Sequence, residues 1–266
     1  MRRTLYLFIF MVLSIFILTS CTDQDYDDLY SSGEYDTLLA LCDEDLSSSI
    51  DPDALYYKML CHYRLGQFEE ANRSAIVYYA VADKDDDARL DDALRIILYY
   101  NDDSLLAVKA GERLCSRPGA GVDEKMSYFK ALMATGDYEK AAELYNSIRG
   151  ELTDRQAALM CIDAKASSTL IVSNLEAWVL ADGRSDETRD AVMSAARILL
   201  ARGEGQLLLS TALNVYQVGD GLLAILIGDI YAQMGIPGTA STYYSYAYED
   251  FPQMTMSRLR ALQRRT

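Results

Sequence analysis

Apolar residues recur at helical spacing along most of the chain, and single turn-forming residues interrupt them at regular intervals. The clearest stretch has Ile227 and Tyr231 four residues apart, and Tyr244 and Ala247 three residues apart. Each of these pairs falls on one face of a helix. Gly235 lies between the two pairs, where a reversal of the chain favours a residue that can be left-handed. The pattern predicts two helices joined by a tight turn.

The same unit recurs seven times. Its turn positions are 32 to 35 residues apart, and six of the seven hold Gly or Asn, which enter the left-handed region at low cost. These positions are Gly33, Gly66, Asn101, Gly136, Ser168, Gly203 and Gly235. We therefore predict an all-α fold, an α-solenoid of about seven helix pairs over residues 29–252, with no linker between domains. A capping helix is expected over residues 253–266, whose four Arg could fold back on an acidic body.

Three units share further residues. They are Phe68 and Ala71 after Gly66, Tyr138 and Ala141 after Gly136, and Gly228, Ala240 and Pro252 around Gly235. The pattern resembles the tetratricopeptide repeat (TPR), in which small residues let two helices approach closely and Pro ends the second helix. Other units depart from it: Asp103 stands where the motif has an aromatic residue, and Leu106 replaces the small Ala. Another helical-hairpin repeat therefore stays open.

The N-terminus has the pattern of a secretory signal over residues 1–20. Arg2 and Arg3 precede an apolar run from Leu5 to Leu18 that is too short to span a bilayer comfortably. The sequence Leu18-Thr19-Ser20-Cys21 resembles the bacterial lipobox, which implies cleavage before Cys21 and lipidation of its thiol. An ordinary signal peptide followed by a chance Cys is the alternative.

Two or three acyl chains on Cys21 would hold the protein on a membrane. Residues 21–28 are acidic and are expected to form a solvated tether. Thr22 follows Cys21, and by resemblance to Gram-negative sorting, where Asp at this position retains lipoproteins in the inner membrane, this favours the outer membrane, facing the periplasm.

The charge is strongly acidic and uneven. The whole chain has 40 Asp and Glu against 25 Lys and Arg, and residues 21–103 alone hold 21 acidic and 6 basic side chains. A body of this charge is not expected to bind nucleic acid, because that interaction depends on neutralising phosphates with Lys and Arg.

Candidate chemistry is sparse. The only histidine, His62, lies in a predicted helix beside Cys61, so a structural role is favoured over catalysis. Asp83–Asp87 begins like a calcium loop, but Ala88 and Leu94 stand where such a loop needs Gly and Glu, which favours a solvated loop. We predict no metal, no cofactor and no enzymatic activity. An envelope enzyme that uses carboxylates for catalysis is kept as an alternative, ranked after the two binding functions given below.

Four cysteines remain beside Cys21. Their spacing matches no metal knuckle, and each lies in an apolar helical stretch, so small buried side chains are favoured over disulfides. They are Cys42, Cys61, Cys115 and Cys161.

Aromatic and basic residues indicate a binding surface. The chain has 20 Tyr, and both members of an adjacent pair cannot point inward from a helix, so one ring of pairs such as Tyr56-Tyr57 and Tyr99-Tyr100 is left for a groove. The resemblance to TPR domains places the residue six positions before each turn in the concave groove. The six positions hold Leu60, Arg95, Lys130, Ile162, Arg197 and Asp229, and Arg64 and Lys165 lie on further groove-facing turns. Together with the tyrosine pairs, this gives the site candidates Tyr56, Arg64, Arg95, Tyr99, Lys130, Lys165, Arg197 and Asp229.

Basic residues hold three of the six groove positions, which indicates a groove for an acidic or C-terminal carboxylate segment of a partner. Internal ion pairs with the many carboxylates are the competing interpretation. The expected function is a membrane-anchored scaffold for protein partners in the cell envelope. The alternative is an accessory lipoprotein of a TRAP-type solute-uptake system, which binds a solute-binding protein or a small ligand.

Overall fold

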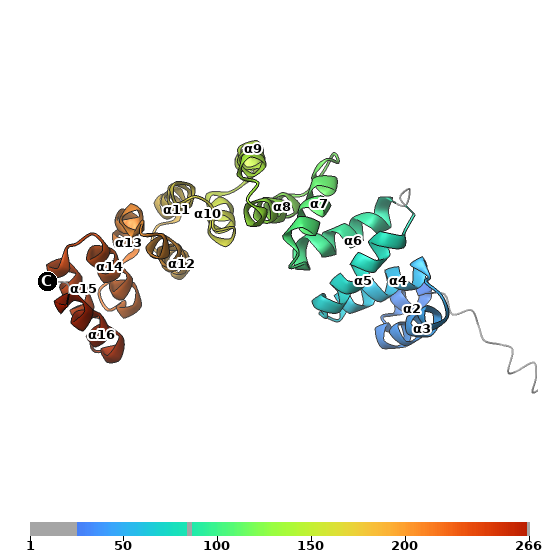
Figure 1. The fold of residues 1–266 in the computed structure, drawn as a ribbon, viewed down its shortest axis with the longest axis horizontal. Coiled ribbons are helices and arrows are strands. Elements are labelled where there is room, and N and C mark those ends of the chain that lie inside the picture. Colours follow the sequence, from blue (N-terminus) through green and yellow to red (C-terminus); the bar gives the residue numbers. More distant parts are fainter. Residues whose placement is uncertain (1–25, 84–86, 265–266) are drawn as a thin grey trace, which may run out of the picture. The chain divides into compact units, whose positions relative to one another are not determined.

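The computed structural model describes residues 26–83 and 87–264, and every regular element in these ranges is a helix (Figure 1). The predicted all-α class is confirmed. Consecutive helices pack against one another, and the first helix of one pair also contacts the first helix of the next, as in the series α8, α10, α12 and α14. Packing of this kind stabilises an array between neighbours rather than around one central core.

Two compact units divide the chain, with the boundary between Leu106 and Ala107. The first holds α2 (Tyr26–Ser32), α3 (Tyr35–Ser48), α4 (Pro52–Arg64), α5 (Phe68–Val81) and α6 (Asp87–Tyr100). A single uninterrupted array was expected from the sequence. The boundary falls inside α7 (Ser104–Cys115), in the pair where Asp103 and Leu106 replace the aromatic and small residues of the motif.

The second unit continues to the C-terminus. It holds α8 (Val122–Thr135), α9 (Tyr138–Ile148), α10 (Asp154–Asp163), α11 (Ser168–Asp182), α12 (Asp186–Arg202), α13 (Leu209–Val215), α14 (Gly221–Gln233), α15 (Pro237–Tyr246) and α16 (Pro252–Gln263). Two short 3-10 helices, Arg149–Glu151 and Gly205–Leu208, lie between them. The helices α16 and α15 pack together, which places α16 where the capping helix was predicted.

Left-handed turns separate the helices of most pairs. Five of the seven predicted turn residues have positive φ: Gly33, Gly66, Gly136, Gly203 and Gly235. Ser168 was a wrong assignment, because it is the first residue of α11 and the left-handed residue of that pair is Lys165, at φ 49. Asn101 is not left-handed either; its side-chain oxygen accepts a hydrogen bond from the Asp103 backbone N–H at 2.8 Å.

The first helix of the described residues, α2, starts at Tyr26, so helix is present before residue 29, where the repeat domain was expected to start. The Tyr26 hydroxyl donates to Asp45, and the Asp27 carboxylate accepts a hydrogen bond from Tyr57. Because these contacts fix the first turn of α2 against α3 and α4, part of the expected tether is ordered helix. Cys21, the expected signal peptide and most of Asp83–Asp87 lie outside the described residues.

Candidate functional site

An exposed group of aromatic rings lies at one end of α4, α5 and α6 in the first unit. It comprises Tyr63, Phe68, Tyr99 and Tyr100, which we call the aromatic cluster. The Phe68 ring stacks on Tyr100 with centroids 4.4 Å apart, and Tyr63 meets these two rings edge-on at 5.8 and 6.1 Å. Tyr63, Phe68 and Tyr99 are 39%, 41% and 39% exposed. Aromatic side chains are enriched in surfaces that bind other proteins.

The local sequence explains how the cluster forms. The left-handed turn at Gly66, at φ 73, reverses the chain and sets Tyr63 at the end of α4 beside Phe68 at the start of α5. The helices α5 and α6 pack together, which brings the end of α6 with Tyr100 against Phe68. Burial, and then the charge and hydrogen bonding of Tyr63, raise the pKa of the Tyr100 hydroxyl. Tyr99, a predicted site residue, meets the Tyr100 ring edge-on at 6.3 Å.

Tyr56, by contrast, is part of an internal network. Its hydroxyl donates to Asp92 at 2.8 Å, and the Arg89 guanidinium lies over its ring, 4.8 Å from the centroid. Burial, followed by the hydrogen bond to Asp92, raises the pKa of the Tyr56 hydroxyl. Tyr56 is half-buried and Tyr57 is buried, so both rings serve mainly to join α4 to its neighbours.

The two predicted basic residues of the first unit have internal partners. Arg95 pairs with Asp92 at 3.3 Å, one helical turn away. Arg64 donates from Nε to the Tyr30 hydroxyl at 2.8 Å, and its guanidinium lies over the Tyr30 ring. The competing interpretation, an internal ion pair with a carboxylate, describes Arg95, whereas the partner of Arg64 is a tyrosine.

The second unit differs in this respect. Lys130 on α8 and Arg197 on α12 are exposed, and neither has an ion-pair partner among the described residues. The helix α10 packs against both α8 and α12, and its equivalent residue, Ile162, is buried. Lys130 and Arg197 therefore remain available to a partner, but a buried apolar residue stands at the position between them.

Asp229 on α14 is covered by the capping helix. Arg258 of α16 donates to its two carboxylate oxygens at 2.7 and 2.9 Å, and the buried Tyr244 donates to it at 2.8 Å. The basic C-terminal segment thus folds back on the acidic body, as the charge pattern suggested. Asp229 acts in the structure as the anchor of α16.

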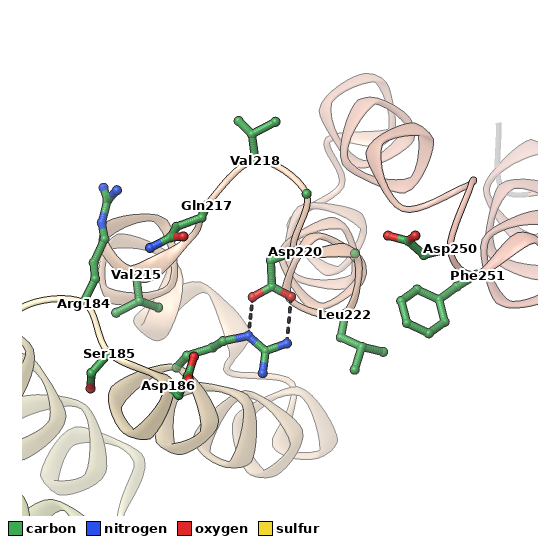
Figure 2. A pocket seen from close by; sticks show the side chains of 13 residues that line it. Arg184, Ser185, Asp186, Val215, Gln217, Val218, Asp220, Leu222, Asp250 and Phe251 are labelled. Atoms are coloured by element: carbon green, nitrogen blue, oxygen red, sulfur yellow. Dashed lines mark hydrogen bonds and ion pairs between the residues drawn. The ribbon is translucent and has the colours of Figure 1, made fainter.

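A hollow of about 850 Å³ lies at the starts of α12, α14 and α16. Figure 2 shows Asp220 with two dashed contacts at its centre, and Val218 on the loop above, pointing away from them. The contacts join Asp220 to Arg189. The Ser185 hydroxyl accepts from the Thr188 N–H, and Asp220 also caps α14 through the Leu223 N–H. Since these polar groups serve helix ends and the ion pair, we assign this hollow a structural role.

The surroundings of the four cysteines and of His62 are those of structural side chains. Cys42, Cys61 and Cys161 are buried and Cys115 is half-buried, and all four are free. The Nδ1 atom of His62 lies 2.6 Å from Oε1 of Gln67. No group of three or more His, Cys, Asp or Glu within the described ranges could hold a metal ion.

The aromatic cluster went largely unnoticed in the sequence. Tyr99 was assigned to a groove and Tyr100 was named only as the other member of that adjacent pair. Phe68 counted only as a motif residue, and no role was predicted for Tyr63. A usable signal exists, since all of these residues lie within three positions of the turns at Gly66 and Asn101.

No protein-family model matches the chain, and no curated protein matches it. In the described part of the chain, no helix combines the length and hydrophobicity needed to cross a bilayer.

Proposed function

We propose that this protein is a helical-repeat scaffold that binds protein partners in the cell envelope and is held at a membrane by a lipid on Cys21. The observation that carries the proposal is the exposed aromatic cluster of Tyr63, Phe68, Tyr99 and Tyr100. It supplies a contact surface on a frame of helices that pack consecutively.

The cluster has the composition of an interaction hot spot. Partner binding would remove three partly exposed rings from water, and rings of this size dominate the binding energy of many interfaces. The side-chain conformations of these rings are already fixed by stacking and edge contacts, so little side-chain entropy is lost on binding.

The surrounding charge indicates the partner's character. The first unit is rich in carboxylates, and Asp102 and Asp103 directly follow the cluster in the sequence. A segment with apolar residues flanked by Lys or Arg would complement both the rings and the carboxylates. In the second unit, the exposed Lys130 and Arg197 are the residues that would pair with the acidic partner segment expected from the sequence.

Crosslinking in intact cells, followed by affinity capture and mass spectrometry, tests the scaffold role. A Tyr63→Ala/Phe68→Ala variant should lose a protein that the wild-type chain captures. The matched control is Tyr248→Ala, because Tyr248 is 47% exposed but belongs to the second unit and has no ring partner in the aromatic contacts of the described residues. Equal capture by all three chains would contradict the role of the cluster.

The lipid anchor is tested separately. Metabolic labelling with palmitate should mark the wild-type protein, and Cys21→Ala should remove the label and release the chain from the membrane fraction. A Cys21→Ala chain that remains membrane-bound would contradict anchoring through this residue, whatever the outcome of the capture experiment.

A further inference from the structure

Lys165 occupies a backbone position that other turns give to Gly. It is the one non-glycine residue with positive φ in the described ranges, at φ 49, whereas the turns before and after it use Gly136 and Gly203. A side chain in this region costs about 1 kcal/mol or more. Because Gly would avoid that cost, the lysine side chain itself is expected to contribute something.

The turn that carries Lys165 is held from a neighbouring helix. The Arg202 guanidinium, at the end of α12, donates to the carbonyl oxygens of Lys165 and Ala166 at 2.6 and 2.7 Å. It also reaches the Ser168 hydroxyl at 3.2 Å. These bonds fix the backbone of the turn, so the place from which the Lys165 side chain extends is set in advance.

Lys165 lines an apolar pocket of about 440 Å³ between α8, α9, α11 and the end of α12. The fully buried side chains of Phe129 and Ala141 contribute to its wall, together with Met133 and Leu170. Tyr138, 65% exposed, stands at its edge. Small-molecule sites are typically of this size and this apolar character, with a few polar groups.

The charge of this pocket is opposite to that of the protein. Its lining includes Lys165 and Arg202 and no Asp or Glu, although acidic residues outnumber basic ones 40 to 25 in the chain. Lys165 has no ion-pair partner among the described residues. The pocket also includes Ser167, which caps the N-terminus of α11, and the positive end of that helix favours an anion further.

We propose that this pocket binds a small amphipathic carboxylate, with its apolar body against Phe129, Met133 and Leu170 and its carboxylate paired with Lys165. The site is separate from the aromatic cluster and independent of the scaffold role. This proposal explains why a lysine stands at a position with positive φ, because Gly at position 165 could not supply the cation.

Decanoate is a suitable probe because it combines an apolar chain with a carboxylate. The full-length protein and its variants are each reconstituted in the same lipid, so that their affinities can be compared. Isothermal titration should show decanoate binding at least about tenfold more tightly than decanol, which has the same chain length and no charge. Lys165→Gly and Lys165→Met should each weaken decanoate binding about tenfold or more. The control Lys130→Met removes an exposed lysine outside the pocket and should leave binding unchanged.

Two further measurements separate binding from folding. Lys165→Gly should unfold at the same temperature as the wild type or higher, since Gly accepts the left-handed turn, so its loss of binding would not reflect unfolding. Ala142→Phe, at an exposed position of the lining, should block decanoate by filling the pocket. Equal decanoate affinity for wild type and Lys165→Gly, or for decanoate and decanol, would overturn the proposal. The proposal would also be overturned if the pocket bound a peptide with an apolar C-terminus and did not bind decanoate.

Discussion

Arg189 and Asp220 form a bidentate ion pair that joins α12 to α14. These are the first helices of two consecutive helix pairs. Nη2 of Arg189 lies 2.8 Å from Oδ1 of Asp220, and Nε donates to the second carboxylate oxygen. The same carboxylate accepts the Leu223 N–H at 3.1 Å and so caps α14. One side chain thus fixes both the start of a helix and its place against the neighbouring pair.

Replacing Asp220 should therefore destabilise the second unit. The Asp220 side chain is only 12% exposed, and Asp220→Asn would remove its charge while leaving Arg189 partly buried. We expect a loss of about 2 kcal/mol in the free energy of unfolding, measured by urea denaturation.

Asp190 provides the matched control for this substitution. It pairs with the same Arg189 at 2.9 Å, but its side chain is 71% exposed. Asp190→Asn should cost less than about 0.5 kcal/mol, because exposed ion pairs contribute little. Similar losses for the two variants would contradict the role assigned to the Asp220 contact.

The Asp220 ion pair should also make stability depend on pH. Burial opposes the charge of Asp220, but hydrogen bonds from Arg189 and Leu223 outweigh it and lower the pKa of this carboxyl below its ordinary value. The stabilisation is then fully present above the unfolded-state pKa, about 3.9, and is lost as the pH falls through the lower folded-state value. Urea denaturation at several pH values should show the difference between wild type and Asp220→Asn shrinking below about pH 4. A difference that grows in acid would contradict this account.

Much of the fold could be predicted from the sequence because it depends on local pattern. Gly66 and Gly203 were identified as turn residues from their spacing and their low cost in the left-handed region. The prediction for the helix pair between the turns at Gly136 and Gly203 was wrong for the same reason. Spacing and composition pointed to Ser168, whereas the turn is made by Lys165, a residue that the pattern does not associate with left-handed backbone.

The site was less predictable because it depends on contacts between helices. Arg95 and Arg197 occupy equivalent positions in the repeat, yet Arg95 pairs with Asp92 and Arg197 has no ion-pair partner among the described residues. With 40 carboxylates in the chain, sequence alone could not show which basic residue would be paired. The stacking of Phe68 on Tyr100 likewise joins residues 32 positions apart and follows only from the packing of α5 on α6.

The thiols should be unreactive in the folded protein. Burial raises the pKa of Cys61 to about 11 and that of Cys161 to about 12, so almost none of either is thiolate at pH 8. Reaction with a chromogenic disulfide reagent should be slow until urea unfolds the chain. Ser116→Cys, at an exposed position beside Cys115, supplies a reactive control.

Counting the thiols adds a second result. The unfolded chain should release four equivalents without reductant, one for each of Cys42, Cys61, Cys115 and Cys161. Two equivalents would show a disulfide in the isolated protein. Five would show that Cys21 is free rather than lipidated.

Gly228 should be intolerant of even one added methyl group. A Cβ atom at this position would lie 2.5 Å from Cε1 of Tyr244, whose buried ring is held by the hydrogen bond from its hydroxyl to Asp229. Because Tyr244 cannot move without breaking that bond, Gly228→Ala should force α14 and α15 apart and cost about 1–3 kcal/mol in the free energy of unfolding. Gly238→Ala, in α15, is the matched control: nothing lies within 4 Å of its Cβ, and replacing Gly in a helix should stabilise the protein by about 0.5–1 kcal/mol. Urea denaturation of both variants tests the close approach of the two helices, and equal effects would show that the small residue at position 228 is not required for it.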